Sequence, residues 1–238
     1  MYANENSAPK LLVIGGTSSL APQLFELAEK DGFDICATYR DSESVSGHSN
    51  INWLHLDLSK RESIDLFFSQ IRSLKFVRIV FLVGKTSGFK QRIYSEGELE
   101  IYFNTQLIRP IKVIDRLVSF LELEKPSNLL FISSRAALYG SHDWPYGVAK
   151  AGIQNFVTSA SKVIEKPKSV LSVASGLIVG STMQMEMTDE VVNSHKSRAR
   201  ENGLDLMTIT DFVTQIWNLD PVVTLEMNGQ VVEIGAVY

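Results

Sequence analysis

The chain has 238 residues, of which 45% are hydrophobic and 21% charged, and its formal net charge is −4. A chain of this size and composition buries a substantial core without disulfide or metal staples, which excludes a disordered protein. The mild negative charge offers no concentrated basic face, so we expect no nucleic-acid partner.

Residues 1–8 are polar and predict a flexible tail that lacks the basic flank and apolar stretch of a signal peptide. After this tail, short apolar runs that predict strands alternate with segments of helical period. The expected strands are residues 10–14, 33–39, 52–58, 76–83, 129–132, 170–174 and 230–234. The expected helices are residues 20–30, 59–74, 95–124, 146–164 and 208–219.

This alternation predicts an α/β fold of the Rossmann-like, doubly wound kind, with a parallel sheet between two layers of helices. No linker or repeat divides the sequence, so we expect one domain over residues 1–238. Cys36 is the only cysteine, which excludes an intramolecular disulfide, and no run of about 18 apolar residues predicts a membrane span. We therefore expect a cytoplasmic protein.

A phosphate-binding turn is predicted directly after the first strand, where residues 15–21 read Gly-Gly-Thr-Ser-Ser-Leu-Ala and open the first helix. Small residues let the backbone approach a pyrophosphate, and a helix N-terminus offers N–H groups and a positive dipole end. Compared with the usual three-glycine fingerprint only the first glycine remains, and an ordinary strand–helix turn is the alternative interpretation. The expected cofactor contacts here are Gly15, Thr17, Ser18, Ser19 and Leu20.

The ends of the next strands indicate which nucleotide is bound. Arg40 follows the second strand and suits a 2′-phosphate through its forked donors, which favours NADP(H) over NAD(H). The alternative is a surface arginine paired with Asp41. Asp57 and Leu58 end the third strand, where a carboxylate would accept a hydrogen bond from adenine, and Gly84 would let the backbone pass the adenosine ribose.

The segment from Ser133 to Lys150 indicates acid–base chemistry. Tyr146 and Lys150 are four residues apart and share one face of the predicted helix. An ammonium beside a phenol lowers the pKa of the phenol toward the working range. A serine hydroxyl at the end of the preceding strand, Ser134, would bind the same substrate oxygen.

These motifs together resemble the short-chain dehydrogenase/reductase family, and the resemblance covers nearly the whole chain. It is carried by Gly15, Asp57, residues 132–134, Tyr146 with Lys150, residues 175–178 (similar to the family's Pro-Gly turn) and residues 228–235 (similar to its last strand).

The resemblance implies about seven parallel strands and a reaction in which hydride transfer with an NAD(P) cofactor interconverts a carbonyl and an alcohol. Tyr146 would exchange the proton, and Lys150 would lower the pKa of Tyr146 and hold the nicotinamide ribose. Ser134 would orient the substrate, with Ser133 as its alternative, and Asn104 would support a water-linked proton relay. Gly176 and Ile178 would contact the cofactor.

Three departures from the family pattern bear on the cofactor site more than on the chemistry. Residues 81–84 keep only Gly84 of the family's Asn-Asn-Ala-Gly, and Ser175 replaces the proline of Pro-Gly. The family's following threonine falls near Gly180, where Ser181 or Thr182 would substitute.

The substrate side is expected in residues 180–206, which break the strand–helix rhythm and would form a lid. The alternating Met183, Met185 and Met187 would adapt to an apolar ligand or pack the lid on the body of the fold. His142 and Trp144 are expected at the rim of the pocket, and Arg135 is a candidate for an acidic substrate group.

We therefore expect an NADP(H)-dependent enzyme acting on a small carbonyl or alcohol, without a metal, and forming a homodimer or homotetramer through its long helices. The altered glycine turn favours, as an alternative, a non-catalytic NAD(P)-binding sensor or scaffold. A third hypothesis is an NAD-dependent epimerase or dehydratase, against which Arg40 and the short substrate segment argue.

Overall fold

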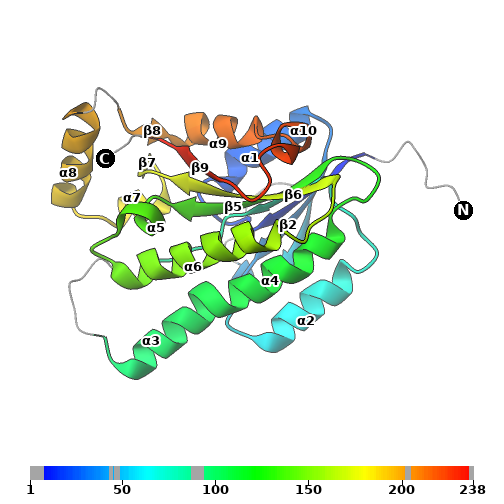
Figure 1. The fold of residues 1–238 in the computed structure, drawn as a ribbon, viewed down its shortest axis with the longest axis horizontal. Coiled ribbons are helices and arrows are strands. Elements are labelled where there is room, and N and C mark those ends of the chain that lie inside the picture. Colours follow the sequence, from blue (N-terminus) through cyan, green and yellow to red (C-terminus); the bar gives the residue numbers. More distant parts are fainter. Residues whose placement is uncertain (1–7, 43–44, 46–48, 87–93, 202–204, 236–238) are drawn as a thin grey trace, which may run out of the picture.

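A parallel sheet runs through the part of the chain that the computed structural model describes, residues 8–42, 45, 49–86, 94–201 and 205–235. Seven strands lie in the order β3-β2-β1-β4-β5-β6-β9, and every neighbouring pair is parallel (Figure 1). The strands are β1 (Lys10–Ile14), β2 (Asp34–Tyr39), β3 (Ile51–His55), β4 (Arg78–Phe81), β5 (Ser127–Ser134), β6 (Lys168–Ser175) and β9 (Val231–Ile234). The predicted fold class is thus confirmed, and the strand order reverses between β1 and β4, where folds of this kind bind ligands.

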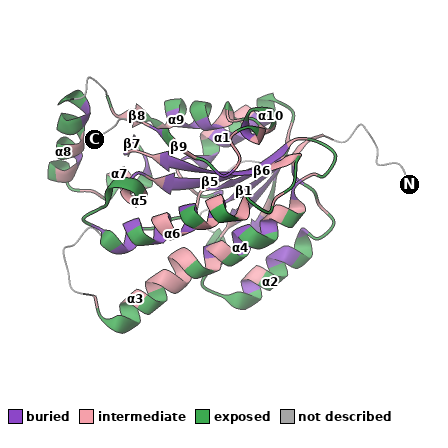
Figure 2. Ribbon diagram, in the orientation of Figure 1, coloured by how far each residue is buried: buried purple, intermediate pink, exposed green. Residues whose placement is uncertain are grey.

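Helices cover both faces of this sheet, as Figures 1 and 2 show. Side chains alternate along β1: Leu12 and Ile14 join one buried cluster, and Leu11 and Val13 join the other. The first cluster includes residues of α2 (Arg61–Gln70), α4 (Arg109–Leu117) and α6 (Trp144–Ala160). The second includes residues of α1 (Ala21–Lys30) and α9 (Ile209–Trp217). The central strands are consequently buried on both faces, which explains their unbroken apolar sequences.

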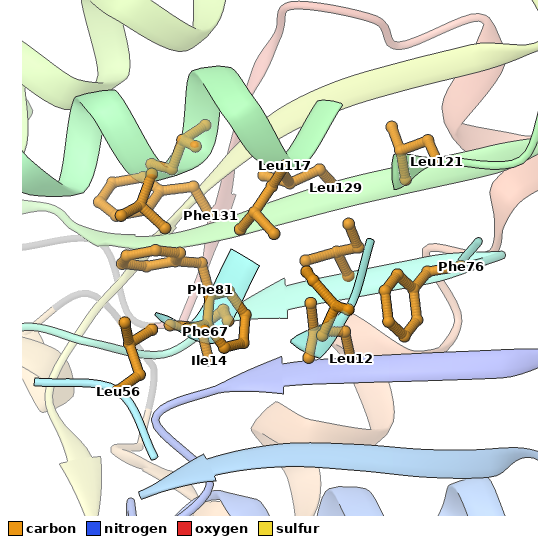
Figure 3. Packing of buried hydrophobic residues seen from close by; sticks show 14 of the residues in the cluster. Leu12, Ile14, Leu56, Phe67, Phe76, Phe81, Leu117, Leu121, Leu129 and Phe131 are labelled. Atoms are coloured by element: carbon orange, nitrogen blue, oxygen red, sulfur yellow. The ribbon is translucent and has the colours of Figure 1, made fainter. Parts of the chain in front are cut away.

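Large aromatic and aliphatic side chains fill the first cluster (Figure 3). Phe81 of β4 and Phe131 of β5 pack with their ring centroids 5.9 Å apart. Leu12, Phe81, Leu117 and Phe131 are fully shielded from solvent. This packing fixes the carboxyl ends of β4 and β5, from which two parts of the candidate site extend.

The single helix predicted over residues 95–124 is wrong. The segment does begin at the expected residue, where Ser95 is the N-cap and forms a capping box with Glu98. It then divides into α3 (Glu96–Phe103), a π-helical turn η2 (Asn104–Ile108), α4 and a 3-10 turn η3 (Val118–Phe120). Pro110 explains the break, because it has no N–H for the carbonyl four residues earlier and its ring needs room there.

The predicted lid, residues 180–206, contains two helices that we did not predict, α7 (Thr182–Met185) and α8 (Asp189–Glu201). Its two ends are held together because β7 (Ile178–Val179) pairs with β8 (Met207–Thr208). In Figure 1, α8 lies beyond the carboxyl ends of the sheet strands. The short helices α5 (Ala136–Tyr139) and α10 (Pro221–Leu225) were also not predicted. None of the described helices is both long and apolar enough to cross a membrane.

Arg78 is a buried cation in the middle of this fold, only 2% exposed at the start of β4. Its guanidinium donates to the carbonyls of Trp217 and Leu219, each at 2.9 Å, and lies 4.5 Å from the centroid of the Trp217 ring. Burial lowers its pKa to about 10. Arg78 therefore holds the loop after α9 against the sheet.

Replacing Arg78 with methionine is expected to lower the free energy of unfolding by about 2–3 kcal/mol, because buried carbonyls lose a charged donor. Urea denaturation followed by tryptophan fluorescence measures this loss. Arg61→Met is the matched control, since the Arg61 side chain is 88% exposed and should change stability by less than about 0.5 kcal/mol. Equal stabilities of the two variants would contradict the role given to Arg78.

Candidate active site

A cavity of about 810 Å³ lies at the carboxyl ends of the strands, within the size range of small-molecule sites. It brings together residues from six sheet strands or the loops that follow them, and from α7. The predicted site residues in its wall are Gly15, Thr17, Ser18, Ser19, Leu20, Arg40, Asp57, Leu58, Gly84, Ser134, Tyr146, Lys150, Gly176 and Ile178.

At one end of the cavity the turn after β1 is shaped by two glycines and by Thr38. Gly15 has a φ of +90°, a conformation that favours glycine. A Cβ on Gly16 would lie only 2.7 Å from the Cβ of Ala37, so β2 can pass closely. The N–H of Gly15 donates to Thr38 Oγ1, and that of Gly16 to the Thr38 carbonyl, both at 2.8 Å. The glycines therefore let the turn pack tightly on β2 and on the segment after β4, while Gly15, Thr17, Ser18 and Ser19 line the cavity.

Sequence reasoning missed Thr38, although a polar residue inside the otherwise apolar second strand is a usable signal. Thr38 is 2% exposed and lies two residues before Arg40. Thr38 therefore connects the phosphate turn to the end of β2, where Arg40 is predicted to favour NADP(H) over NAD(H).

Arg40 is paired with Asp41 through two contacts of 2.8 Å from Nε and Nη2. The arginine side chain is 66% exposed, so an incoming anion can reach it. Asp57 Oδ1 accepts from the N–H of Ser59 at 2.8 Å, and Lys60 Nζ lies 3.5 Å from Oδ2. Burial opposes ionisation of Asp57, but the hydrogen bonds from Ser59 and the charge of Lys60 outweigh it and lower the pKa.

The predicted catalytic side chains meet near the ends of β5 and α6. The helix α6 begins after Asp143, whose carboxylate accepts from the N–H of Tyr146 at 3.4 Å, and Pro145 lies in its first turn. Ser134 and Tyr146 both line the cavity, and hydrogen bonding by Ser134 acts to lower the pKa of Tyr146. Ser133 is engaged elsewhere, since its Oγ accepts from Gln154 at 2.9 Å. The arrangement therefore favours Ser134 over Ser133 as the substrate-binding hydroxyl.

Lys150 lies within hydrogen-bonding distance of two strand ends. Its Nζ donates to the carbonyls of Val83 at 3.2 Å and Ile132 at 3.1 Å, and lies 5.8 Å from the centroid of the Tyr146 ring. The side chain is almost completely buried. Burial lowers the pKa of Lys150 to about 7.

The pKa of Tyr146 shows no lowering by Lys150 in this structure, and that role of Lys150 stays a prediction. Burial raises the pKa of Tyr146 to about 12; the hydrogen bond with Ser134 lowers it, and the charge of Asp143 raises it further. No contribution from Lys150 offsets this, because the lysine is itself driven toward the neutral amine. Tyr146 is consequently a protonated phenol at neutral pH.

Gly84 has a different neighbour from the predicted ribose: a Cβ at Gly84 would lie 2.8 Å from Cε of Lys150 and closer still to Nζ. The amine of Lys150 occupies the space that a Cβ at position 84 would fill. A side chain at this position would therefore displace Lys150.

Gly84→Ala is accordingly expected to lower kcat by about 100-fold, because a displacement of about 1 Å at a catalytic group has effects of this size. Steady-state kinetics with NADPH and a reactive carbonyl measures the loss. Gly97→Ala serves as control, since a Cβ on Gly97 meets nothing within 4 Å. Normal turnover by Gly84→Ala would show that the tight contact with Lys150 is unimportant.

The structure does not bring Asn104 into the cavity wall. Asn104 is the first residue of the η2 turn, and the wall at this point is formed by Thr105 and Gln106, neither of which we predicted. Gln106 Oε1 accepts from the N–H of Lys85 at 2.9 Å. The π-helical turn, which the sequence pattern did not reveal, shifts which side chains face the cavity, and a relay through Asn104 stays a prediction.

The rim residues also differ from expectation. His142 and Trp144 are not among the residues of the cavity wall, and Trp144 packs instead on Tyr94 and Phe103. Arg135 is buried and lies 2.8 Å from Glu233, so it is not available to a substrate. Of the three lid methionines only Met183 lines the cavity, together with Glu186.

The fold of this chain matches the folds of solved protein structures. The chain superposes on a short-chain dehydrogenase family protein from Francisella tularensis with a TM-score of 0.80 and 14% identity, covering 96% of this chain and 97% of the other. The chain has the short-chain dehydrogenase/reductase fold. The predicted resemblance to that enzyme family is confirmed.

Two further relatives extend the likeness. L-sorbose reductase from Gluconobacter frateurii, solved with NADPH and L-sorbose, matches with a TM-score of 0.79 and 16% identity over 97% of this chain and 96% of that one. An uncharacterised oxidoreductase from Schizosaccharomyces pombe is 26% identical in a 225-residue alignment that covers 84% of this chain and 89% of the relative. No family model matches the chain.

Proposed function

We propose that the protein is an NADP(H)-dependent oxidoreductase that interconverts a carbonyl and an alcohol. The observation that carries the proposal is the position of Ser134, Tyr146 and Lys150 in the wall of the same cavity as the phosphate turn and Arg40. One cavity thus offers acid–base groups together with a place for a dinucleotide.

The cavity fits such a cofactor on two structural grounds. The turn before α1 lines the cavity with small residues, Gly15, Thr17, Ser18 and Ser19, where a pyrophosphate could approach the backbone and the helix N-terminus. The cavity continues from Arg40 to Tyr146, so the nucleotide and the reacting groups would share it. When bound, the cofactor supplies or accepts the hydride.

The side chains of this protein handle the proton. Ser134 donates to or accepts from the substrate oxygen and holds it near the Tyr146 hydroxyl. The raised pKa of Tyr146 keeps its proton available, so the phenol suits donation to an oxygen that gains charge as a carbonyl is reduced. Lys150, between the ends of β4 and β5, would hold ribose hydroxyls in place of the carbonyls that it now contacts.

Preference for NADP(H) is proposed from Arg40, because its exposed guanidinium can exchange Asp41 for a 2′-phosphate. The titration of NADPH and NADH by fluorescence tests both the function and the preference. We expect tighter binding of NADPH, and Arg40→Gln should weaken NADPH binding about 10-fold while leaving NADH unchanged. If neither nucleotide binds, the oxidoreductase proposal fails, as does the alternative of a nucleotide-binding sensor.

A nucleotide-binding sensor or scaffold remains the second candidate function, favoured by the replacement of two turn glycines by Ser19 and Ala21. NADPH binding without oxidation of the bound nucleotide by any of a broad set of aldehydes and ketones would support it. The buried hydrogen bond between Tyr146 and Ser134, which a scaffold does not need, favours the enzyme. The epimerase or dehydratase hypothesis predicts tightly retained NAD, which the same titration would reveal.

A small carbonyl or alcohol is the proposed substrate, and we propose a homo-oligomer that lies in the cytoplasm. Ile101, Ile108 and Val148 expose apolar surface on α3, η2 and α6, the helices expected at the interface. Light scattering would give the assembly state, and fractionation the location.

A further inference from the structure

The phosphate turn is directly connected to the first helix of the lid. Ser19 Oγ accepts a hydrogen bond from the N–H of Thr182 at 3.1 Å, although the two residues are 163 positions apart. Both residues line the cavity, Ser19 from the turn before α1 and Thr182 from the start of α7. We name this hydrogen bond the turn–lid contact.

The backbone N–H of Thr182 needs an acceptor from outside its own helix. It is the first residue of α7, and the first N–H groups of a helix have no partner within the helix. The N-cap Ser181 satisfies the N–H of Gln184 at 3.2 Å and donates its own hydroxyl to the Ile178 carbonyl at 2.8 Å. Ser19 therefore satisfies the N–H of Thr182, and a glycine at position 19 would have no side chain to do so.

The helix that this contact holds forms one wall of the candidate active site. Met183 of α7 and Glu186 directly after it line the cavity. The base of this segment is fixed by the pairing of β7 with β8, and Gly180 N–H donates to Gln184 Oε1 at 3.1 Å. These contacts hold α7 near the strand end, and the turn–lid contact joins it to the other wall of the cavity.

We propose that Ser19 is a positioning residue: through Thr182 it fixes α7 against the phosphate turn and so slows the release of the bound nucleotide. This proposal rests on the proposed function, since it concerns the same cofactor site. Ser19, which replaces a glycine of the usual turn, would then join the turn to the lid.

Two substitutions remove the contact from opposite sides. Ser19→Ala removes the acceptor, and Thr182→Pro removes the donor N–H. Proline is tolerated at the first position of a helix, and the preceding Ser181, at φ −72° and ψ 151°, already has the conformation that precedes proline. Thr182→Ala is the reference for Thr182→Pro, because both variants lose the hydroxyl and only the proline variant also loses the N–H.

The decisive measurement is the dissociation rate of NADPH by stopped-flow fluorescence. We expect Ser19→Ala and Thr182→Pro each to raise the rate by about 3- to 10-fold, the range for one hydrogen bond. The double variant should be no faster than either single variant, because both remove the same bond. Additive effects would overturn the proposal and indicate that Ser19 acts directly on the phosphates. An unchanged rate in Thr182→Pro would also overturn it.

A second measurement does not depend on the cofactor. In hydrogen exchange of the ligand-free protein, Ser19→Ala should accelerate exchange in peptides that cover residues 181–186 by about 3- to 10-fold. Thr210→Val is the control, since Thr210 also joins two elements through a hydroxyl, to Gln23 at 3.4 Å, but lies outside the cavity wall. Unchanged exchange in Ser19→Ala would refute the contact, whereas accelerated exchange without NADPH binding would refute only the proposed function.

Discussion

Tyr146→Phe is expected to lower kcat for carbonyl reduction by about 1,000-fold or more, with the Kd for NADPH within about twofold of the wild-type value. General acid catalysis contributes about 100- to 10,000-fold, and a phenyl ring has no proton to give. The ring itself is retained, so the walls of the buried site keep their shape. Initial rates of NADPH oxidation and fluorescence titration measure the two quantities.

The control for this variant is Tyr139→Phe. Tyr139 also carries a hydrogen-bonded hydroxyl, which contacts both carboxylate oxygens of Glu233 at 3.0 and 3.1 Å, but it is exposed and outside the cavity wall. It should retain normal turnover. A Tyr146→Phe enzyme that keeps near-normal activity would refute the proposed chemistry even if NADPH still binds.

Lys150→Met should change how the stability of the ligand-free protein depends on pH. Burial lowers the pKa of Lys150 from 10.5 to about 7. Between these pH values the unfolded chain holds a proton that the folded chain has lost, so the free energy of unfolding rises with pH. The rise is at most about 1.4 kcal/mol per pH unit. Below pH 7 both states hold the proton and this contribution is constant and unfavourable.

The variant has no such proton, so the stability of wild type minus that of Lys150→Met should increase from pH 7 toward pH 10. Urea denaturation at several pH values gives this difference, in which the buried Cys36 thiol contributes equally to both proteins and cancels. Lys166→Met, at an exposed position, is the control. Parallel curves for wild type and Lys150→Met would show that the lysine is not held as a neutral amine. Activity should meanwhile fall by about 100-fold.

The strands could be predicted because each is a short apolar run between turn residues, and parallel strands place their carboxyl ends together. That rule also placed Gly15, Arg40, Ser134 and Lys150 around one cavity. Asp143 could have been found from its position before Trp-Pro, a typical helix start. Pro110 likewise signalled the break in the long helix.

Other features depend on burial and contacts that no sequence pattern contains. The protonation of Tyr146 and Lys150 follows from how completely the fold excludes water from them. Arg135 pairs with Glu233, 98 positions later, so an arginine engaged in an ion pair was interpreted from the sequence as a candidate substrate ligand. The hydrogen bond between Ser19 and Thr182 is of the same long-range kind.

The buried guanidinium of Arg78 also constrains the order of events during synthesis of the chain. Its carbonyl partners lie 139 and 141 residues later, so β4 leaves the ribosome long before they exist. A cation cannot enter an apolar interior without its acceptors at an acceptable free energy. The guanidinium therefore stays in contact with water until residues 217–219 are made, and the start of β4 is covered only after α9 has been synthesised.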